Sequence, residues 1–331
     1  MKKITLNIAI SLLFVSCLNK NDMITIIDCN GTQGKPEYML FKTENEGYMF
    51  CYKGGLYQNS SIFVYKTTDS GKNWEQIYYQ NRCYFALYST LILFNNAIYG
   101  NVYDPEDITN YNLFKLDLAT QEFKLINPDD FGVDRVGGII GTKGNDISVF
   151  FNKNKQSGIL TTDTDFSSFS LKPFNYTIKD GGIINDSTNI YFITWKNQLV
   201  IETNGEYKEV AINNPAAITK IAENKVLIAT NEQENAINLY QYDLANDRLE
   251  KLHTFENYSI INHLQSNEKV IVGFVGNIKG MFVEYDLIYS TDKGQTWQKQ
   301  KLKEKNLITP NCLVDNILYI YSGRKLQKIV F

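Results

Sequence analysis

The chain has 331 residues, enough for one large core or two ordinary domains, and its 36 acidic residues nearly balance 33 basic ones. No basic block runs along the sequence, which argues against nucleic acid as a partner. Apolar residues come in short runs bounded by Asn, Asp, Gly, Ser and Lys, with many Tyr (22) and Phe (19) and few Pro (6). This pattern predicts an all-β protein of many short strands joined by tight turns.

The first residues predict an export signal. In "MKKITLNIAISLLFVSC", Lys2 and Lys3 precede an apolar run from Ile4 to Val15. That run is too short to span a bilayer as a stable helix, and it fits the apolar region of a signal peptide.

The end of this run resembles the lipobox of bacterial lipoproteins, in which the cysteine becomes the lipidated first residue. The matching residues are Phe14-Val15-Ser16-Cys17, with Phe14 where the motif usually has Leu. The resemblance implies a signal peptide at residues 1–16, a lipidated Cys17 with a short tether at 17–22, and a membrane-anchored domain at 23–331. The expected location is the bacterial cell envelope, on the periplasmic or surface face of the outer membrane. The alternative is an ordinary signal peptide and a secreted protein.

The sequence after the tether repeats one pattern seven times, a polar turn followed by a β-branched or aromatic run. Examples are "LFNNAIYGNVY" and "LVDNILYIYS". The repeats follow one another at intervals of about 45 residues, the period of a four-stranded propeller blade. The first apolar residues after the seven turns are Tyr48, Ile98, Ile147, Ile190, Val226, Val270 and Ile317.

A second hairpin follows six of the seven repeats, and one of these contains Asn204-Gly205, a dipeptide typical of a type I′ turn. After the seventh repeat only one strand, "KLQKIVF", remains. We expect the isolated segment "MITIID" (23–28) to pair with residues 325–330 and close the ring, because an open ring would expose unpaired strand edges. The prediction is a single seven-bladed β-propeller. Six or eight blades follow if one repeat is miscounted, and a β-helix fits less well because its repeats are shorter.

Two segments share an unusual spacing of hydroxyl, acid, glycine and tryptophan. "STDKGQTW" (290–297) and "TTDSGKNW" (67–74) match the Asp-box, S-x-D-x-G-x-T-W, or BNR repeat. The chain resembles the Asp-box propellers of the sialidase superfamily here. That group also includes sortilin-type receptors, xyloglucan-cleaving glycosidases and a photosystem II assembly factor. The box residues are Thr67, Asp69, Gly71, Trp74, Ser290, Asp292, Gly294, Thr296 and Trp297.

The residue types of the box suit a turn. An aspartate and a Ser or Thr hydroxyl can accept hydrogen bonds from backbone N–H groups, and glycine adopts positive φ without steric cost. The tryptophan would then cover the gap to the adjoining sheet. In the family the motif lies on the outer hairpin, away from the ligand-binding axis, so we expect a structural role. A third, degenerate copy, "TTDTDFSSF" (161–169), has Asp165 in place of the glycine and Phe169 in place of the tryptophan.

The resemblance calls for a test of enzymatic activity. Sialidases hold the substrate carboxylate with three arginines, the first in an Arg-Ile-Pro motif, because planar bidentate donors suit a carboxylate. None of the four arginines here (Arg82, Arg135, Arg248 and Arg324) is followed by Ile-Pro. The repeats place Arg248 on an outer hairpin and Arg324 in a turn. We therefore expect no arginine triad and assign no catalytic residue.

A glycosidase with two carboxylates is harder to exclude, because the chain has many acids. Candidate acids lie in predicted loops and are interpreted as solvated turn residues: Asp104, Glu106, Asp107, Asp129 and Asp130. Calcium binding by Asp163 and Asp165 is a weaker hypothesis, since the oxygen ligands are sparse. No metal and no cofactor are expected.

The cysteines allow several arrangements. Cys29, Cys51, Cys83 and Cys312 could form disulfides in three pairings or remain buried thiols, and their spacing with only two histidines argues against a zinc site. Trp195 lies at the end of a predicted inner strand, where core packing is the favoured role and stacking on a sugar the alternative.

The sequence thus predicts a monomeric, lipid-anchored propeller that binds a protein or glycan partner or acts as a scaffold. Loops at 103–111 and 277–286 could reach that partner. The alternatives are a divergent sialidase-like glycoside hydrolase acting on extracellular glycans, an assembly factor for an envelope complex, and a domain that has lost an ancestral activity.

Overall fold

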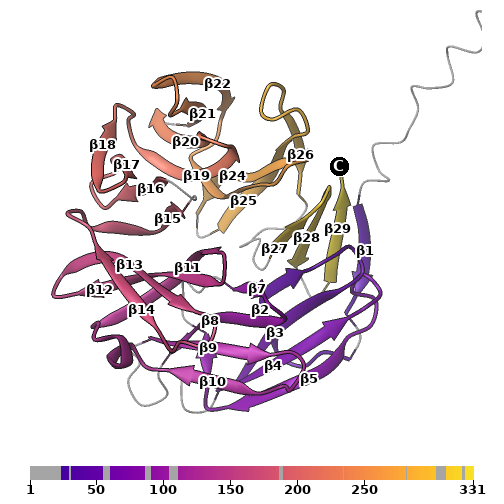
Figure 1. The fold of residues 1–331 in the computed structure, drawn as a ribbon. Helices are drawn as coiled ribbons and strands as arrows, with labels where there is room; N and C mark the ends of the chain where they lie inside the picture. Colours follow the sequence, from indigo (N-terminus) through magenta and orange to yellow (C-terminus); the bar gives the residue numbers. More distant parts are fainter. Residues whose placement is uncertain are drawn as a thin grey trace, which may run out of the picture.

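The computed structural model forms a ring of seven antiparallel β-sheets (Figure 1). It describes residues 24–29, 31–54, 60–85, 91–103, 111–185, 189–233, 235–280, 282–302, 311–322 and 325–331. The predicted signal peptide and Cys17 lie outside these residues. The prediction of a seven-bladed β-propeller is confirmed.

The first three blades take their strands in chain order, starting from the ring axis. Blade 1 contains β2 (Lys35–Phe41), β3 (Gly47–Gly54), β4 (Ser60–Thr67) and β5 (Glu75–Asn81). Blade 2 has an innermost strand in two pieces, β6 (Tyr84–Phe85) and β7 (Ile92–Phe94), which both pair with β8 (Ala97–Tyr103), followed by β9 (Tyr111–Asp117) and β10 (Phe123–Ile126). Blade 3 contains β11 (Arg135–Lys143), β12 (Asp146–Lys153), β13 (Gln156–Asp163) and β14 (Phe169–Pro173).

The next three blades repeat this order. Blade 4 contains β15 (Ile178–Asn185), β16 (Asn189–Thr194), β17 (Leu199–Thr203) and β18 (Glu206–Val210). Blade 5 contains β19 (Pro215–Ala222), β20 (Lys225–Gln233), β21 (Ala236–Asp243) and β22 (Arg248–Glu256). Blade 6 contains β23 (Ile260–Ser266), β24 (Ile271–Lys279), β25 (Phe282–Ser290) and β26 (Gln298–Lys301).

Blade 7 closes the ring with both ends of the chain. Its strands are β27 (Asn311–Val314), β28 (Ile317–Ser322), β29 (Lys325–Val330) and, outermost, the N-terminal β1 (Ile24–Asp28). β1 runs antiparallel to β29, and the two strands lie side by side in Figure 1. The predicted closure by residues 23–28 is confirmed.

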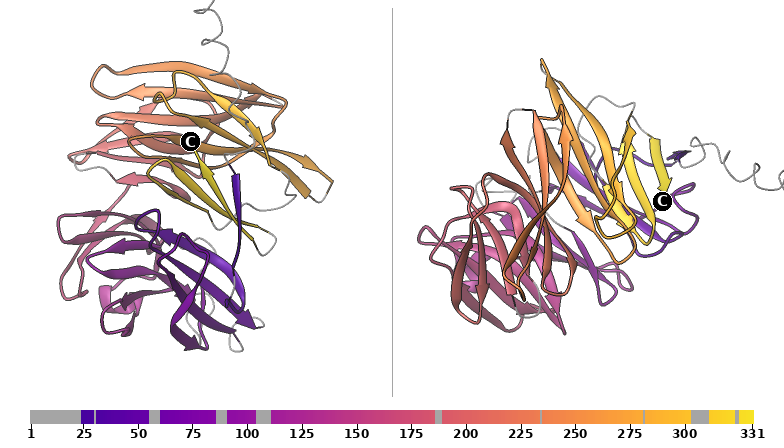
Figure 2. Two further views of the ribbon diagram at one scale, coloured as in Figure 1. Left: turned by 90° about the vertical axis from the view of Figure 1, so that its right-hand side faces the viewer. Right: turned by 90° about the horizontal axis from the view of Figure 1, so that it is seen from above.

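The hydrophobic core is divided among the seams between blades. The described residues form seven apolar clusters, each built from two neighbouring blades. Figure 2 shows the sheets packing face to face around the ring. Because successive strand residues point to opposite faces, a middle strand contributes to the seams on both of its sides. β8 and β16 are accordingly buried along their whole length. Each fully buried Phe or Leu side chain stabilises the fold by about 1.5–3 kcal/mol.

The turns confirm a second sequence prediction. Between β17 and β18, Asn204 and Gly205 have φ of 52° and 93°. Positive φ at both central residues is the signature of a type I′ hairpin turn.

Each blade has two ends, and these define two faces of the ring. We call upper the face formed by the inter-blade connections and the turns between second and third strands. The lower face is formed by the turns between first and second and between third and fourth strands. As the fourth strand of blade 7, β1 runs from the lower face to the upper face, so the chain enters the ring at Ile24 on the lower face. Within the described residues, no helix is both long enough and apolar enough to cross a membrane.

Candidate functional site

The segment of blade 6 that matches the Asp-box pattern forms the lower-face turn between β25 and β26. The Ser290 hydroxyl donates to Asp292 Oδ1 at 2.7 Å and accepts the Gly294 N–H at 2.7 Å. Asp292 in turn accepts the Thr296 hydroxyl at 2.6 Å and the Thr296 N–H at 2.9 Å. These hydrogen bonds, with that of the Thr296 hydroxyl first, lower the pKa of Asp292 to about 2.

The segment of blade 1 that matches the same pattern has the same contacts between β4 and β5. Thr67 donates to Asp69 Oδ1 at 2.9 Å and accepts the Gly71 N–H at 2.9 Å. Asp69 accepts the backbone N–H of Asn73 at 2.9 Å and its side-chain amide at 2.7 Å. The amide of Asn73 thus occupies the role that the Thr296 hydroxyl has in blade 6.

The two box tryptophans contact the preceding blade. Trp297 donates its indole N–H to Gly294 O at 3.0 Å and lies edge-on to Phe255 of blade 5, with ring centroids 5.9 Å apart. Trp74 is 7% exposed and belongs to the apolar cluster shared with Tyr319 of blade 7. Both rings therefore cover a seam between two sheets.

The degenerate third copy also forms a turn, between β13 and β14. Asp163 accepts the hydroxyl of Ser167 at 2.6 Å and that of Ser168 at 2.8 Å, and these bonds hold its pKa well below the usual value. Asp165 forms a separate ion pair with Lys115 at 2.7 Å. Phe169, 49% exposed, leaves its seam less covered than a tryptophan does. The described residues contain no cluster of His, Cys, Asp or Glu that could hold a metal ion.

Two further aspartates occupy the same turn in blades 2 and 5. Asp117 accepts the N–H groups of Ala119 and Thr120, and Asp243 accepts those of Ala245 and Asn246. The two segments are similar in sequence, "LDLATQEF" in blade 2 and "YDLANDRL" in blade 5, and this similarity is the signal that could have located the two aspartates.

The described arginines form no triad. Arg248 lies on β22, the outermost strand of blade 5, as predicted, and pairs with Glu250 at 3.3 Å. Arg135 begins the innermost strand of blade 3, with its guanidinium 4.1 Å from the ring centroid of Tyr111. Arg82 follows β5 of blade 1, and Arg324 lies outside the described residues.

The loop acids and the cysteines have local roles where they are described. Asp129 and Asp130 lie in η2 (Pro128–Phe131), a 3₁₀ helix in which Asp130 completes a capping box with Asn127. Asp104, Glu106 and Asp107 lie outside the described residues. The four cysteines beyond the signal are free thiols, and burial raises the pKa of Cys51 to about 12.

The favoured prediction for Trp195 was wrong. Its side chain is 63% exposed on the upper face, and its backbone N–H donates to Thr177 O at 3.1 Å. β16 ends at Thr194, so Trp195 stands in the turn beyond the last residue that the neighbouring blades cover.

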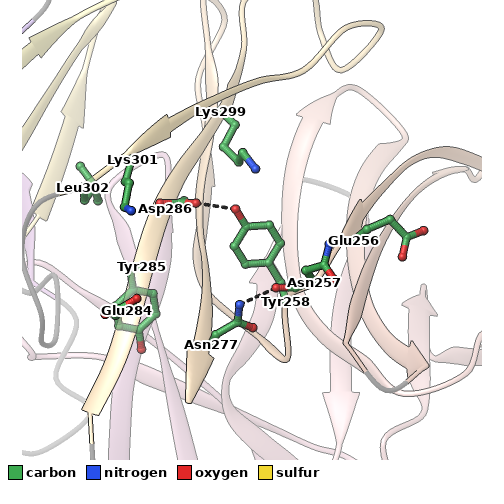
Figure 3. A pocket seen from close by; sticks show the side chains of 10 residues that line it. All are labelled: Glu256, Asn257, Tyr258, Asn277, Glu284, Tyr285, Asp286, Lys299, Lys301 and Leu302. Atoms are coloured by element: carbon green, nitrogen blue, oxygen red, sulfur yellow. Dashed lines mark hydrogen bonds between the residues drawn. The ribbon is translucent and has the colours of Figure 1, made fainter. Parts of the chain in front are cut away.

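A groove opens on the upper face between blades 5 and 6, with a volume of about 710 Å³ (Figure 3). It lies where the end of β22 and the following connection meet β24, β25 and β26. The lining residues are Glu256, Asn257, Tyr258, Asn277, Glu284, Tyr285, Asp286, Lys299, Lys301 and Leu302.

The strand register explains how this set converges. Asn277 is paired with Glu284, and Asp286 with Lys301. Paired residues on adjacent antiparallel strands point to the same side of the sheet, here the side that faces blade 5. Tyr258, from the connection between the blades, then fills the base of the groove.

Hydrogen bonds fix the base and one wall. Tyr258 donates its hydroxyl to Asp286, as Figure 3 shows. Burial first, and then this carboxylate, raise the pKa of Tyr258 above its usual value, so the phenol stays protonated at neutral pH. Asn277 accepts the N–H of Ser259 at 3.1 Å and donates to Asn257 O. The groove is therefore a preformed hollow.

A second cavity of about 520 Å³ lies on the ring axis, at its lower end. The innermost strands of blades 1, 2, 3 and 7 line it, mainly with Leu40, Ile92, Leu93 and Leu313. It contains few groups that could select a polar ligand. The upper groove is the stronger candidate for a functional site.

No protein-family model matches the sequence, and no curated protein shows significant sequence similarity to it. Solved structures do resemble the fold. An oligogalacturonate lyase in complex with manganese has a TM-score of 0.61 at 12% identity, covering 93% of this chain and 96% of the lyase. YCF48 bound to a D1 peptide has a TM-score of 0.56 at 12% identity, covering 93% and 97%. BamB from Moraxella catarrhalis has a TM-score of 0.52 at 12% identity, covering 88% and 83%. At these identities the comparisons show a shared propeller fold alone.

Proposed function

We propose that this chain is a non-catalytic protein of the bacterial cell envelope that holds a protein or glycan partner in the groove between blades 5 and 6. The observation that carries the proposal is the groove itself, about 710 Å³ in volume and lined by charged and amide side chains together with two tyrosines and a leucine. Its size lies in the range of ligand sites in proteins, roughly 300–1,000 Å³. Propellers present such sites on a rigid ring, because buried seams fix the blades that carry them.

The groups in the groove suit binding better than catalysis. The raised pKa of Tyr258 keeps its hydroxyl protonated and donated to Asp286, so the phenol is not an activated nucleophile. Glu284 forms an ion pair with Lys279 at 2.6 Å. A general acid or base requires a group that exchanges its proton with the substrate, and two of the three groove carboxylates, Asp286 and Glu284, already have protein partners.

The Asp-box turns serve a structural role in this proposal. Their aspartates accept hydrogen bonds within the turn, and Trp74 and Trp297 contact the preceding blade. The boxes lie on the lower face, whereas the groove lies on the upper face. We assign to them the bracing of the blade that carries the site.

The anchor and the groove would lie on opposite faces. A lipid on Cys17 would be followed by a tether of about six residues, which reaches about 20 Å when extended. That tether joins β1 at Ile24 on the lower face. The lower face would then be directed towards the membrane and the groove away from it, free to meet a partner. If Cys17 is not lipidated, the same domain would act as a secreted binder.

A protein partner is one form that this function takes. Among the structural neighbours, YCF48 is bound to a D1 peptide. If the partner is a protein, we propose by analogy of fold that this chain is an assembly factor for an envelope complex.

The proposal is tested by site-specific photo-crosslinking in cells. A photoreactive residue replaces Glu256, which is exposed at the groove, and in a control protein it replaces Glu122, exposed on the lower face. We expect a discrete adduct from position 256 alone. No adduct at position 256, or the same adducts from both positions, would contradict the proposal.

The non-catalytic part has its own test. Purified residues 22–331 are assayed for hydrolysis of a broad panel of aryl glycosides, sialosides included. We expect no turnover above a mock purification. Clear turnover would replace the binding proposal by the glycoside hydrolase alternative.

A further inference from the structure

Two lysines of the groove have no counterion among the described residues. Lys299 and Lys301 lie two residues apart on β26 and point to the same side of the sheet. Both are exposed, and within the part of the chain that the structure describes neither forms an ion pair. Some other surface lysines do pair, such as Lys269 with Asp315 at 2.8 Å.

Two of the three acids that line the groove, Asp286 and Glu284, are engaged elsewhere. Asp286 accepts the hydroxyl of Tyr258 through Oδ2, and Glu284 pairs with Lys279. Lys299 Nζ lies 5.3 Å from the centroid of the Tyr258 ring, which holds this ammonium group over the base of the groove. Figure 3 shows both lysines beside Asp286 and Tyr258.

An ammonium group offers three hydrogen-bond donors and no acceptor. A ligand that binds both Lys299 and Lys301 therefore brings acceptor oxygens, and those of a carboxylate also supply the opposite charge. The neighbouring Asp286 and the exposed Asn257 add an acceptor and an amide at the same opening, which suit hydroxyl groups. The ligand thus combines a carboxylate with several hydroxyl groups.

The remaining lining favours a sugar over a peptide. Protein partners are held mainly by apolar and aromatic anchors that enter apolar pockets. Here Leu302 is the one aliphatic side chain in the lining. Tyr258, Tyr285 and Leu302 are all buried, and Tyr285 and Leu302 belong to the apolar cluster shared with blade 7. Charged and amide side chains are therefore the more accessible groups of the groove, and its apolar and aromatic side chains are buried.

We infer that the groove binds an acidic oligosaccharide, in which Lys299 and Lys301 hold a uronate carboxylate while Asp286 and Asn257 contact the sugar hydroxyls. The inference rests on the proposed function, because it specifies the ligand of the same site.

The test measures binding of uronate tetrasaccharides to purified residues 22–331 by calorimetry. The probes are tetragalacturonate, tetramannuronate and a hyaluronan tetrasaccharide, each with its carboxyl-reduced counterpart as a neutral control. We expect at least one acidic probe to bind and its reduced counterpart to bind at least about tenfold more weakly, because a charged hydrogen bond is lost. Binding should also weaken as salt increases.

Variants locate the site. Lys299→Gln and Lys301→Gln should each weaken binding of the acidic probe by about tenfold or more. Lys196→Gln, which changes an exposed lysine on the upper-face turn of blade 4, should leave it unchanged. All three variants should have the melting temperature of the parent protein, since the lysines are exposed.

Three results would overturn the inference. They are failure of every acidic probe to bind, equal binding of the reduced probes, and binding that the groove variants do not affect. A tetraglutamate peptide serves as a further probe, and its binding in preference to the sugars would also overturn the inference. The photo-crosslink from position 256 distinguishes failure of this inference from failure of the proposed function. If the adduct still forms, the groove holds a partner and only the ligand class is wrong.

Discussion

Blades 1 and 6 have nearly identical lower ends and different upper ends. At the lower end, each has an aspartate, a hydroxyl residue and a glycine whose hydrogen bonds close the turn between the third and fourth strands. At the upper end of blade 1, Ser61 donates to Asn81 Oδ1 at 3.0 Å and contacts the Tyr79 hydroxyl at 3.3 Å.

At the upper end of blade 6, the corresponding strands carry Asp286 and Lys301 at the edge of a groove. In blade 1 the polar side chains across the two strands bond to one another, whereas in blade 6 Lys299 and Lys301 keep donors for a ligand. The comparison indicates that the repeated positions of the propeller hold the fold, and that the positions that differ between blades carry the function.

Removal of the closing strand should give the largest effect. Deletion of residues 22–28 removes β1, exposes the edge of β29 and opens the cluster that contains Ile27. We expect the melting temperature to fall by at least about 10 °C, if the protein still folds. Deletion of residues 18–21 alone is the control and should have no effect. An unchanged melting temperature for the first deletion would disprove closure by β1.

The glycine of the blade 1 box should be the most sensitive point of its turn. Gly71 has φ of 87°, and a Cβ there would lie 2.4 Å from Leu326 Cδ2. Gly71→Ala should therefore lower the free energy of unfolding by about 2–4 kcal/mol, from backbone strain and overpacking together.

Gly144→Ala is the matched control for this variant. Gly144 also has positive φ, 60°, but its Cβ would meet no atom within 4 Å, so only the backbone strain of about 1–2 kcal/mol remains. Denaturant unfolding of both variants measures the difference. Equal losses would show that the contact with blade 7 contributes nothing.

The aspartate of the blade 6 box should stabilise the fold in a pH-dependent way. Its pKa is about 2 in the folded protein, against about 3.9 for an unperturbed aspartate. The stabilisation is therefore fully present above pH 4 and is lost as the pH falls towards 2. Asp292→Ala should melt at a lower temperature than the parent at pH 7, and the gap should narrow towards pH 2. A difference in melting temperature that does not change with pH would rule out the charge of Asp292 as the source of the stabilisation. Gln295→Ala is the control within the same turn.

Much of the fold could be predicted from the sequence, because a propeller repeats its signal. The regular intervals between the first apolar residues of the repeats, from Tyr48 and Ile98 to Ile317, predicted the number of blades. Asn204-Gly205 predicted the type of one turn. The division of the innermost strand of blade 2 into β6 and β7 had no such repeated signal.

The groove could be predicted only in part. The segment 277–286 was selected as a loop that could reach a partner, and Asn277, Glu284 and Asp286 line the groove. Tyr258 and Lys301 were not found, because each is an ordinary residue in its own segment. What makes them a site is the register of β25 with β26 and the meeting of two blades, and neither is visible in local sequence.

The smallest effect on stability should come from the groove. The double variant Lys299→Gln/Lys301→Gln changes only exposed side chains, so its free energy of unfolding should stay within about 0.5 kcal/mol of the parent value. Thermal and denaturant unfolding measure this. A larger loss would mean that these lysines support the fold.

One paired measurement tests the division between fold and function most directly. Partner binding and melting temperature are determined side by side for the parent, the double variant Lys299→Gln/Lys301→Gln and Asp292→Ala, with the partner or sugar identified by the experiments above. We expect the double variant to lose binding and keep its melting temperature, and Asp292→Ala to melt at a lower temperature and still bind. Loss of binding by Asp292→Ala at a temperature where this variant is folded, together with full binding by the double variant, would contradict the division between fold and function.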